Sequence, residues 1–187
     1  MDEFSYLSVL LSVVIGLAMT EILQGFRRRI MVAERVRSYW PVRLWSVTLL
    51  LVCAQTWWAM FGLRERHVWK FEEFLVLLAQ VVVLYLVCGL VYPDVERGSE
   101  VDLRAHYFTQ RKRFFTLIVV LTFISIGRDL TIHHALPDPR NLTFHIVYIA
   151  TALIAILTAN EWYHKALALF IAIVFVNYIT TLFVKLQ

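Results

Sequence analysis

Charged residues are scarce in this sequence: Asp, Glu, Lys and Arg make up 17% of the 187 residues, against about 25% in soluble domains. Hydrophobic residues make up 60%, and the mean hydropathy is +0.68. With only four prolines and six glycines, a collagen-like or low-complexity chain is excluded. The composition therefore predicts an integral membrane protein.

Cysteine is also rare, and both cysteines, Cys53 and Cys88, lie in apolar segments. Two cysteines are too few for a disulfide framework, and no neighbouring histidine pair completes a zinc motif. We interpret both as small apolar packing residues. The sequence also lacks the glycine loop that binds phosphates and the HExxH, GxSxG and CxxC patterns. No motif therefore favours an enzyme, and none indicates a cofactor.

Six segments have the length and hydropathy of transmembrane helices, which need about 20 mostly apolar residues. They are residues 4–26, 42–63, 72–92, 114–134, 142–159 and 163–184. The sequence thus predicts an all-α protein, a polytopic bundle of six transmembrane helices in which residues 1–187 form a single transmembrane domain. Because Asp2 and Glu3 precede a long apolar run, we expect the first segment to be a retained helix rather than a cleaved signal peptide.

The basic residues predict the orientation of these spans. Three connections on one side of the membrane hold 12 of the 18 Lys and Arg residues, and such an excess marks the cytoplasmic side. We therefore expect a multi-pass protein of the bacterial inner membrane with both termini outside. The same bias explains the net charge of +4, so we expect the lipid bilayer rather than nucleic acid as its partner.

One basic connection carries a helix-start signal. Ser99 with Asp102 three residues later has the spacing of a capping box. The sequence predicts that residues 99–113 form a helix that leads into the fourth span.

The fourth span carries the most informative polar residues. Thr122, Ser125, Asp129 and His133 recur every three or four residues, so they share one face of a helix. Residues 114–127 are too few to cross a bilayer, so Arg128 and Asp129 lie inside the outer part of the span. Ionisable groups in such positions cost about 2.5–3.5 kcal/mol on insertion scales and commonly mark functional sites.

Polar residues of four other spans lie at comparable depth: His145, Gln55, Gln80 and Asn177. One interpretation is a polar cavity in the outer half of the bundle that binds or passes an ion or a small polar solute. The other is structural, with hydrogen bonds between helices and Arg128 paired with a carboxylate on another helix.

The remaining ionisable candidates lie elsewhere. Glu21 is about 9 Å inside Arg27 along the first span, by the rise of a helix, and an ion site or a pairing with a nearby arginine would satisfy it. His134 and His164 lie near the predicted interfaces, and His106 lies outside the spans. We expect surface roles for these three histidines.

Three functional hypotheses follow. The favoured one is a homo-oligomeric channel or transporter-like protein for an ion or a small polar solute. The second is a membrane redox or metal-dependent enzyme, in which His133 and His145 hold a haem, or Asp129, His133 and His145 hold a metal. The third is an accessory or effector subunit that acts with a soluble cytoplasmic partner.

Overall fold

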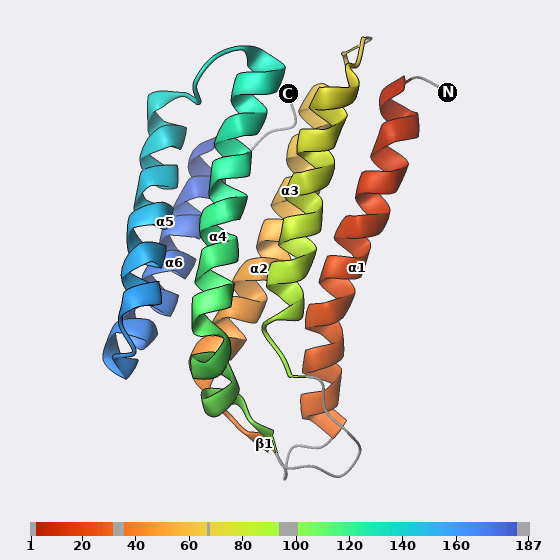
Figure 1. Ribbon diagram of the computed structural model, residues 1–187. Helices are drawn as coiled ribbons and strands as arrows, with labels where there is room; N and C mark the ends of the chain where they lie inside the picture. The colour runs from red at the N-terminus through yellow and green to blue at the C-terminus, as the bar shows by residue number, and fades with distance from the viewer. Residues whose placement is uncertain (1–2, 32–35, 67, 94–100, 183–187) are drawn as a thin grey trace.

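Six long helices run side by side in the part of the chain that the structure describes (Figure 1). The computed structural model describes residues 3–31, 36–66, 68–93 and 101–182. The helices are α1 Glu3–Met31, α2 Trp40–Met60, α3 Phe71–Gly89, α4 Leu103–His133, α5 Pro139–Leu157 and α6 Glu161–Leu182. A 3-10 turn, Phe61–Leu63, extends α2, and two short strands, β1 Val36–Arg37 and β2 Val101–Asp102, complete the described elements.

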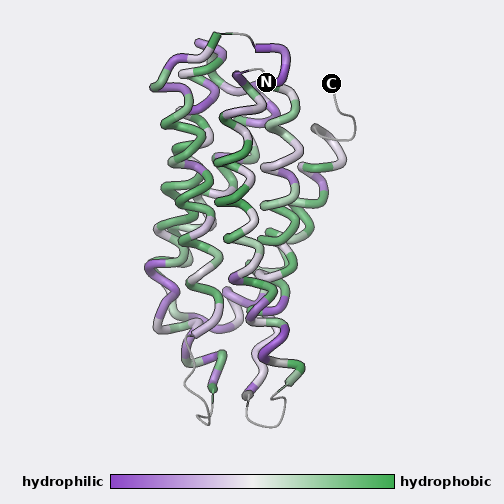
Figure 2. Tube along the Cα trace, turned by 90° about the vertical axis from the view of Figure 1, so that its right-hand side faces the viewer, coloured by the Kyte–Doolittle hydropathy of each residue, from purple (hydrophilic) through white to green (hydrophobic). Residues whose placement is uncertain are grey.

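All six helices are long and apolar enough to cross a membrane. Figure 2 shows the apolar middle of the bundle between more hydrophilic ends. Every predicted span corresponds to one of these helices, so the prediction of an all-α bundle with six transmembrane helices is confirmed. The chain is a multi-pass membrane protein.

The start of α4 differs from the prediction. Val101 and Asp102 form β2, and the side chain of Asp102 accepts a hydrogen bond of 2.9 Å from the backbone nitrogen of Ala105. Asp102 is therefore the N-cap, and the helix begins at Leu103 instead of at residue 99. Ser99, the other half of the expected capping box, lies outside the described residues, as do residues 183–184 of the sixth span.

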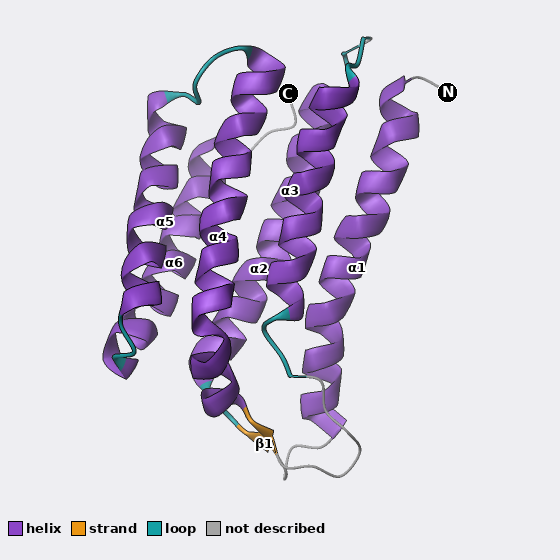
Figure 3. Cartoon of the chain, in the orientation of Figure 1, coloured by secondary structure: helices purple, strands orange, loops and turns teal. Residues whose placement is uncertain are grey.

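The connections divide between two ends of the bundle (Figure 3). What we call the upper end, as drawn in Figure 1, holds the start of α1 and the α2–α3 and α4–α5 connections. The lower end holds the strands and the α5–α6 connection. There β1 and β2 pair in parallel, with Val36 opposite Val101. The connection of the α1–α2 hairpin is therefore joined to that of the α3–α4 hairpin.

Packing between the helices is uneven. The α3 helix packs closely on α1 and α4, and α4 packs closely on α5. In contrast, α2 packs on α6 and α1 and makes little backbone contact with α3 and α4. This arrangement leaves room on the inner side of α2, where the cavities described below are found.

Tyr92, just after α3, ties three helices together at the lower end. Its ring lies against Gly25 of α1, where even a Cβ atom would collide with it. Its hydroxyl is hydrogen-bonded to the hydroxyl of Ser46 on α2 at 2.9 Å. Gly25 is thus required for a close approach between α1 and the end of α3.

Candidate functional site

A cavity that we call the vestibule lies at the upper end between α2, α3 and α4, next to the α4–α5 connection. It has a volume of about 440 Å³. Its polar lining comes from Thr56, Gln80, Arg128, Asp129 and Asn141, and its apolar lining includes Met60, Leu63, Leu77, Ile132 and Leu136. His133 also lines it, although this side chain is exposed.

Arg128 and Asp129 form an ion pair in the vestibule. The Nε and Nη2 atoms of Arg128 donate to Oδ1 of Asp129 at 3.1 and 2.9 Å, and Nη1 lies 3.5 Å from Oε1 of Gln80. Asp129 is only 8% exposed. The expectation that Arg128 pairs with a carboxylate on another helix is wrong, because its partner is the adjacent residue of α4 and its contact on α3 is an amide.

His145 is buried where α5 meets α4. Its Nδ1 lies 2.7 Å from the carbonyl oxygen of Asn141, and its Nε2 lies 3.1 Å from the hydroxyl of Ser125. A carbonyl only accepts hydrogen bonds, so Nδ1 carries the proton and, in the neutral ring, Nε2 accepts from Ser125. The predicted polar face of α4 therefore supplies a partner to α5.

A second cavity, the central cavity, has a volume of about 140 Å³ and lies deeper among α2, α4, α5 and α6. Gln55, Thr122, Ser125 and His145 line it, among other residues. Thr56 and Gln80 line both this cavity and the vestibule. The two cavities therefore adjoin, and together they collect Gln55, Gln80, Arg128, Asp129, His133 and His145 of the predicted site.

Two buried oxygen atoms of residues that line these cavities have no hydrogen-bond partner among the described residues. They are Oδ1 of Asn141, which lines the vestibule, and the hydroxyl of Tyr148, which lines the central cavity. Buried polar groups are normally satisfied by protein, water or ligand, because leaving them unpaired costs free energy. Both cavities are thus chemically suited to water or to a polar solute.

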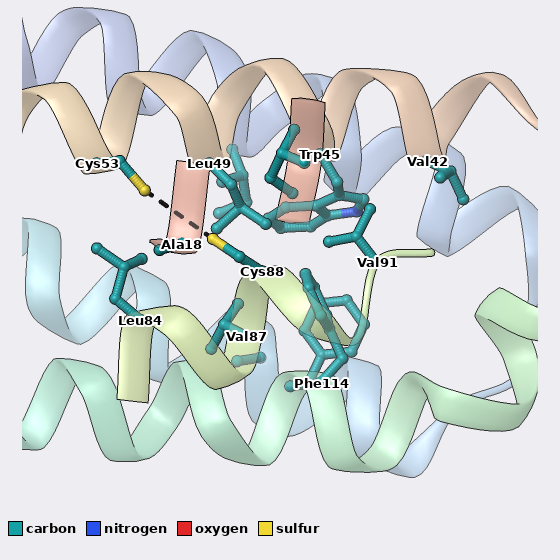
Figure 4. Close-up of a cluster of buried hydrophobic side chains, with 14 of the residues drawn as sticks. Ala18, Val42, Trp45, Leu49, Cys53, Leu84, Val87, Cys88, Val91 and Phe114 are labelled. Atoms are coloured by element: carbon teal, nitrogen blue, oxygen red, sulfur yellow. Dashed lines mark hydrogen bonds between the residues drawn. The ribbon is translucent and has the colours of Figure 1, made fainter. Parts of the chain in front are cut away.

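Below the central cavity the bundle is closed by aromatic side chains. Trp45 lines the central cavity and also a pocket of only about 10 Å³ beneath it, together with Phe114. The centroid of the Trp45 ring lies 5.3 Å from that of the Phe114 ring (Figure 4) and 5.7 Å from that of the Phe115 ring. We call Trp45, Tyr107, Phe114, Phe115 and His164 the aromatic layer.

His164 lies inside this layer and not at the surface. The side chain is 0% exposed, its Nδ1 lies 3.0 Å from the hydroxyl of Tyr107, and its Nε2 lies 3.0 Å from the carbonyl oxygen of Thr158. The expected surface role of His164 is wrong, because the first turn of α6 turns this position toward α4. Of the other two, His106 is half-buried, with Nε2 3.0 Å from the Leu90 carbonyl oxygen, and His134 is exposed as expected.

The rim of the lower end is charged. Glu161 accepts from Arg104 at 2.7 Å and pairs with Lys165 at 2.9 Å. Tyr39 lies nearby with its ring 5.5 Å from that of Tyr107. Burial raises the pKa of Tyr39 to about 12, and the carboxylate of Glu161 acts in the same direction.

Two predicted site residues lie away from both cavities. Asn177 is exposed on α6, where its Oδ1 is 3.4 Å from the hydroxyl of Thr181. Glu21 is half-buried between α1 and α3, 3.5 Å from the hydroxyl of Tyr85. Among the described residues, the partner of Glu21 is therefore a tyrosine and not one of the nearby arginines considered from the sequence.

The positions of the predicted metal ligands can be compared with the geometry that a metal site needs. Within the described part of the chain, no three His, Cys, Asp or Glu side chains are grouped so that they could hold a metal ion. Asp129, His133 and His145 are thus not brought together as a three-ligand site. Both ring nitrogens of His145 are already hydrogen-bonded.

One buried ion pair was not predicted from the sequence. Glu73 is 1% exposed and accepts from Nη2 of Arg66 and from the backbone nitrogen of Lys70. Nη1 of Arg66 donates to the carbonyl oxygen of Ile132 at 2.9 Å. This group, the Arg66 clamp, joins the α2–α3 connection to the end of α4 beside the vestibule. Its only sequence signal is the spacing of Lys70 and Glu73, which is that of a capping box.

The two cysteines are buried between α2 and α3 (Figure 4). Their sulfur atoms lie 3.9 Å apart, and apolar neighbours such as Leu49 and Leu84 surround them. Burial in the apolar core agrees with their interpretation as packing residues.

Comparison of this chain with protein-family models, with curated proteins and with solved structures found no match.

Proposed function

We propose that this protein is a channel or transporter-like membrane protein through which an ion or a small polar solute crosses the bilayer. The observation that carries the proposal is that two cavities with polar linings adjoin inside the bundle. The vestibule, of about 440 Å³, adjoins the central cavity, of about 140 Å³, and Trp45 separates the latter from a pocket of about 10 Å³.

The chemistry of the lining supports this proposal. Ionisable residues inside a membrane are costly and face a water-filled cavity or the bundle interior. Arg128, Asp129 and His145 satisfy that rule, and Asn141 and Tyr148 add buried polar atoms that a passing solute or water would satisfy. The narrowing toward Trp45 corresponds to a conformation open at the upper end and closed below.

The orientation supports entry from outside the cell. The end of α1 and the first part of α4 lie toward the lower end (Figure 1) and carry the exposed basic residues Arg27, Arg28, Arg104, Lys112 and Arg113. Such residues mark the cytoplasmic side. The proposal therefore places the vestibule and both termini outside the bacterial inner membrane.

The proposal includes a homo-oligomer in the bilayer. Within the described residues the α1 helix packs mainly on α3 and α2, and apolar residues such as Val9, Val13 and Leu17 are exposed along it. Native mass spectrometry of the purified protein in detergent counts the copies directly.

Accessibility of an introduced thiol tests the cavity path. In a variant with Cys53→Ala and Cys88→Ala, Thr122→Cys places a thiol at the central cavity. Phe123→Cys is the matched control, because this neighbour on α4 is 57% exposed on the outside of the bundle. We expect a charged, membrane-impermeant methanethiosulfonate added outside to modify Thr122→Cys at least tenfold faster than Phe123→Cys.

Flux measurements complete the test. Proteoliposomes loaded with rubidium, chloride or a small organic solute should release one of them faster than protein-free liposomes, and modification of Thr122→Cys should block that release. If the reagent does not modify Thr122→Cys, or if no solute shows protein-dependent flux, the proposal is overturned.

A further inference from the structure

We infer that the vestibule binds a small zwitterion, an α-amino acid with an aliphatic side chain. This inference rests on the proposed function, because it names the class of solute that would enter the path. Three features of the vestibule carry it: two opposite charges side by side, spare hydrogen-bonding capacity on both, and an apolar lining around them.

The first feature is the charge arrangement. Arg128 and Asp129 are adjacent in the sequence and in direct contact, so the pair carries no net charge. A simple anion that approaches Arg128 also approaches the carboxylate of Asp129, and a simple cation at Asp129 also approaches the guanidinium. In each case repulsion offsets most of the attraction. A zwitterion with its two charges on neighbouring atoms is attracted at both ends.

The second feature is the spare hydrogen-bonding capacity of the pair. A guanidinium has five N–H donors. In Arg128, Nε and Nη2 each donate one N–H to Asp129, and Nη1 donates one to Gln80. The remaining N–H groups suit a carboxylate. Both bonds from Arg128 end on Oδ1 of Asp129, so Oδ2 receives none from the described residues and suits an ammonium group.

A neighbouring amide adds a further acceptor. An ammonium group has three N–H donors, more than one carboxylate oxygen satisfies. Asn141 lines the vestibule, and its Oδ1 is buried without a hydrogen-bond partner among the described residues. The other ionisable groups of the lining, His133 and Asp138, are exposed, and Asp138 already caps the backbone nitrogen of Arg140.

The third feature is the apolar part of the vestibule. Met60 and Leu63 of the α2 end, Leu77 of α3 and Leu136 of the α4–α5 connection line it together with the polar groups. A volume of about 440 Å³ is within the range of small-molecule sites, in which a few polar groups orient a ligand against apolar walls. An aliphatic side chain fits such walls, whereas a bare inorganic ion does not use them.

Three matched probes separate these contributions. L-Leucine carries both charges, 3-methylbutylamine is leucine without the carboxylate, and 4-methylpentanoate is leucine without the amine. With the full-length protein in nanodiscs, we expect calorimetric titration to show leucine binding at least tenfold tighter than either analogue. Leucine should also bind tighter than glycine, which lacks the aliphatic side chain.

A paired substitution localises the binding. Arg128→Gln with Asp129→Asn removes both charges together and leaves no unpaired charge, so we expect a folded protein that loses leucine binding by at least tenfold. Glu161→Gln, at the lower end, is the control and should bind leucine like the parent. Size-exclusion chromatography and circular dichroism confirm that each variant is folded.

The results that would overturn the inference differ from those that would overturn the proposed function. Equal binding of leucine and 4-methylpentanoate, or leucine binding that survives the double substitution, overturns the inference. Absence of leucine binding with a measured flux of rubidium or chloride overturns the inference and leaves the proposed function standing. Leucine binding without flux of any solute overturns the proposed function and leaves a zwitterion-binding site.

Discussion

Arg128 donates from both Nε and Nη2 to a single oxygen, Oδ1, of Asp129, the next residue in the chain. Two opposite charges inside a membrane span are therefore paired within one turn of one helix. Because the pair needs no second helix to form, α4 enters the bilayer with its charges already compensated, and only Gln80 links the pair to α3. The unused oxygen of Asp129 remains available in the vestibule.

Loss of one member of this pair should cost more than loss of both. Asp129→Asn leaves an uncompensated guanidinium, and removal of one partner of a buried pair costs about 3–5 kcal/mol. The double variant, Arg128→Gln with Asp129→Asn, should lose clearly less stability. Reversible unfolding in mixed micelles with increasing sodium dodecyl sulfate measures both. Equal losses would show that the pairing contributes nothing.

His145 should be found as the Nδ1–H tautomer. Its Nδ1 is 2.7 Å from the Asn141 carbonyl oxygen, which cannot donate. In the protein labelled with ¹⁵N-histidine, the spectrum should show a protonated Nδ1 and an unprotonated Nε2. Ser125→Ala should leave Nε2 without a donor and destabilise the protein by about 1–3 kcal/mol, with the tautomer unchanged. A dominant Nε2–H form would contradict this geometry.

The Arg66 clamp should hold the end of α4 in place. Arg66→Ala removes the donor to the Ile132 carbonyl oxygen and leaves Glu73 buried without its cation. Hydrogen exchange of residues 132–136 should become at least tenfold faster, while residues 114–122 should be unaffected. Arg64→Ala is the control, because Arg64 pairs with the exposed Glu65. If both variants exchange alike, the clamp does not act on α4.

Trp45 should close the path at the lower side of the central cavity. Trp45→Ala removes the ring that contacts Phe114 and Phe115 and joins the central cavity to the small pocket below. In inside-out vesicles, the impermeant thiol reagent should then modify Thr122→Cys, which it should not reach when Trp45 is present. Trp162→Ala, at an exposed ring, serves as the control. Unchanged protection in Trp45→Ala would assign the closure to other side chains.

The six spans were predictable from the sequence because length and hydropathy are local properties of a segment. The depth of Arg128, Asp129, Gln80 and His145 followed in the same way, from a fixed rise per residue. The polar face of α4 was also readable from its helical spacing, and the contact of Ser125 with His145 agrees with it.

The rotation of each helix about its own axis was not predictable, since it depends on which neighbours it packs against. Asn177, expected to line the cavity, is exposed on α6, whereas His164, expected at the surface, is 0% exposed. The Arg66 clamp was missed for another reason. It joins the α2–α3 connection to the end of α4, which is far away in the sequence, and only the capping spacing of Lys70 and Glu73 indicated it.

The parallel pairing of Val36 with Val101 has a mechanical consequence. Sliding the α1–α2 hairpin past the α3–α4 hairpin along the bundle axis would break this register. A small tilt of one hairpin relative to the other, hinged at the strands, would not. Arg128 lies 25 helical residues above Leu103, a lever of about 38 Å at 1.5 Å per residue. A rotation of about 5° at the strands would therefore displace Arg128 by about 3 Å, given this lever length. Such a small tilt at the strand end of the bundle would thus be enlarged into a shift of a side chain that lines the vestibule at the other end.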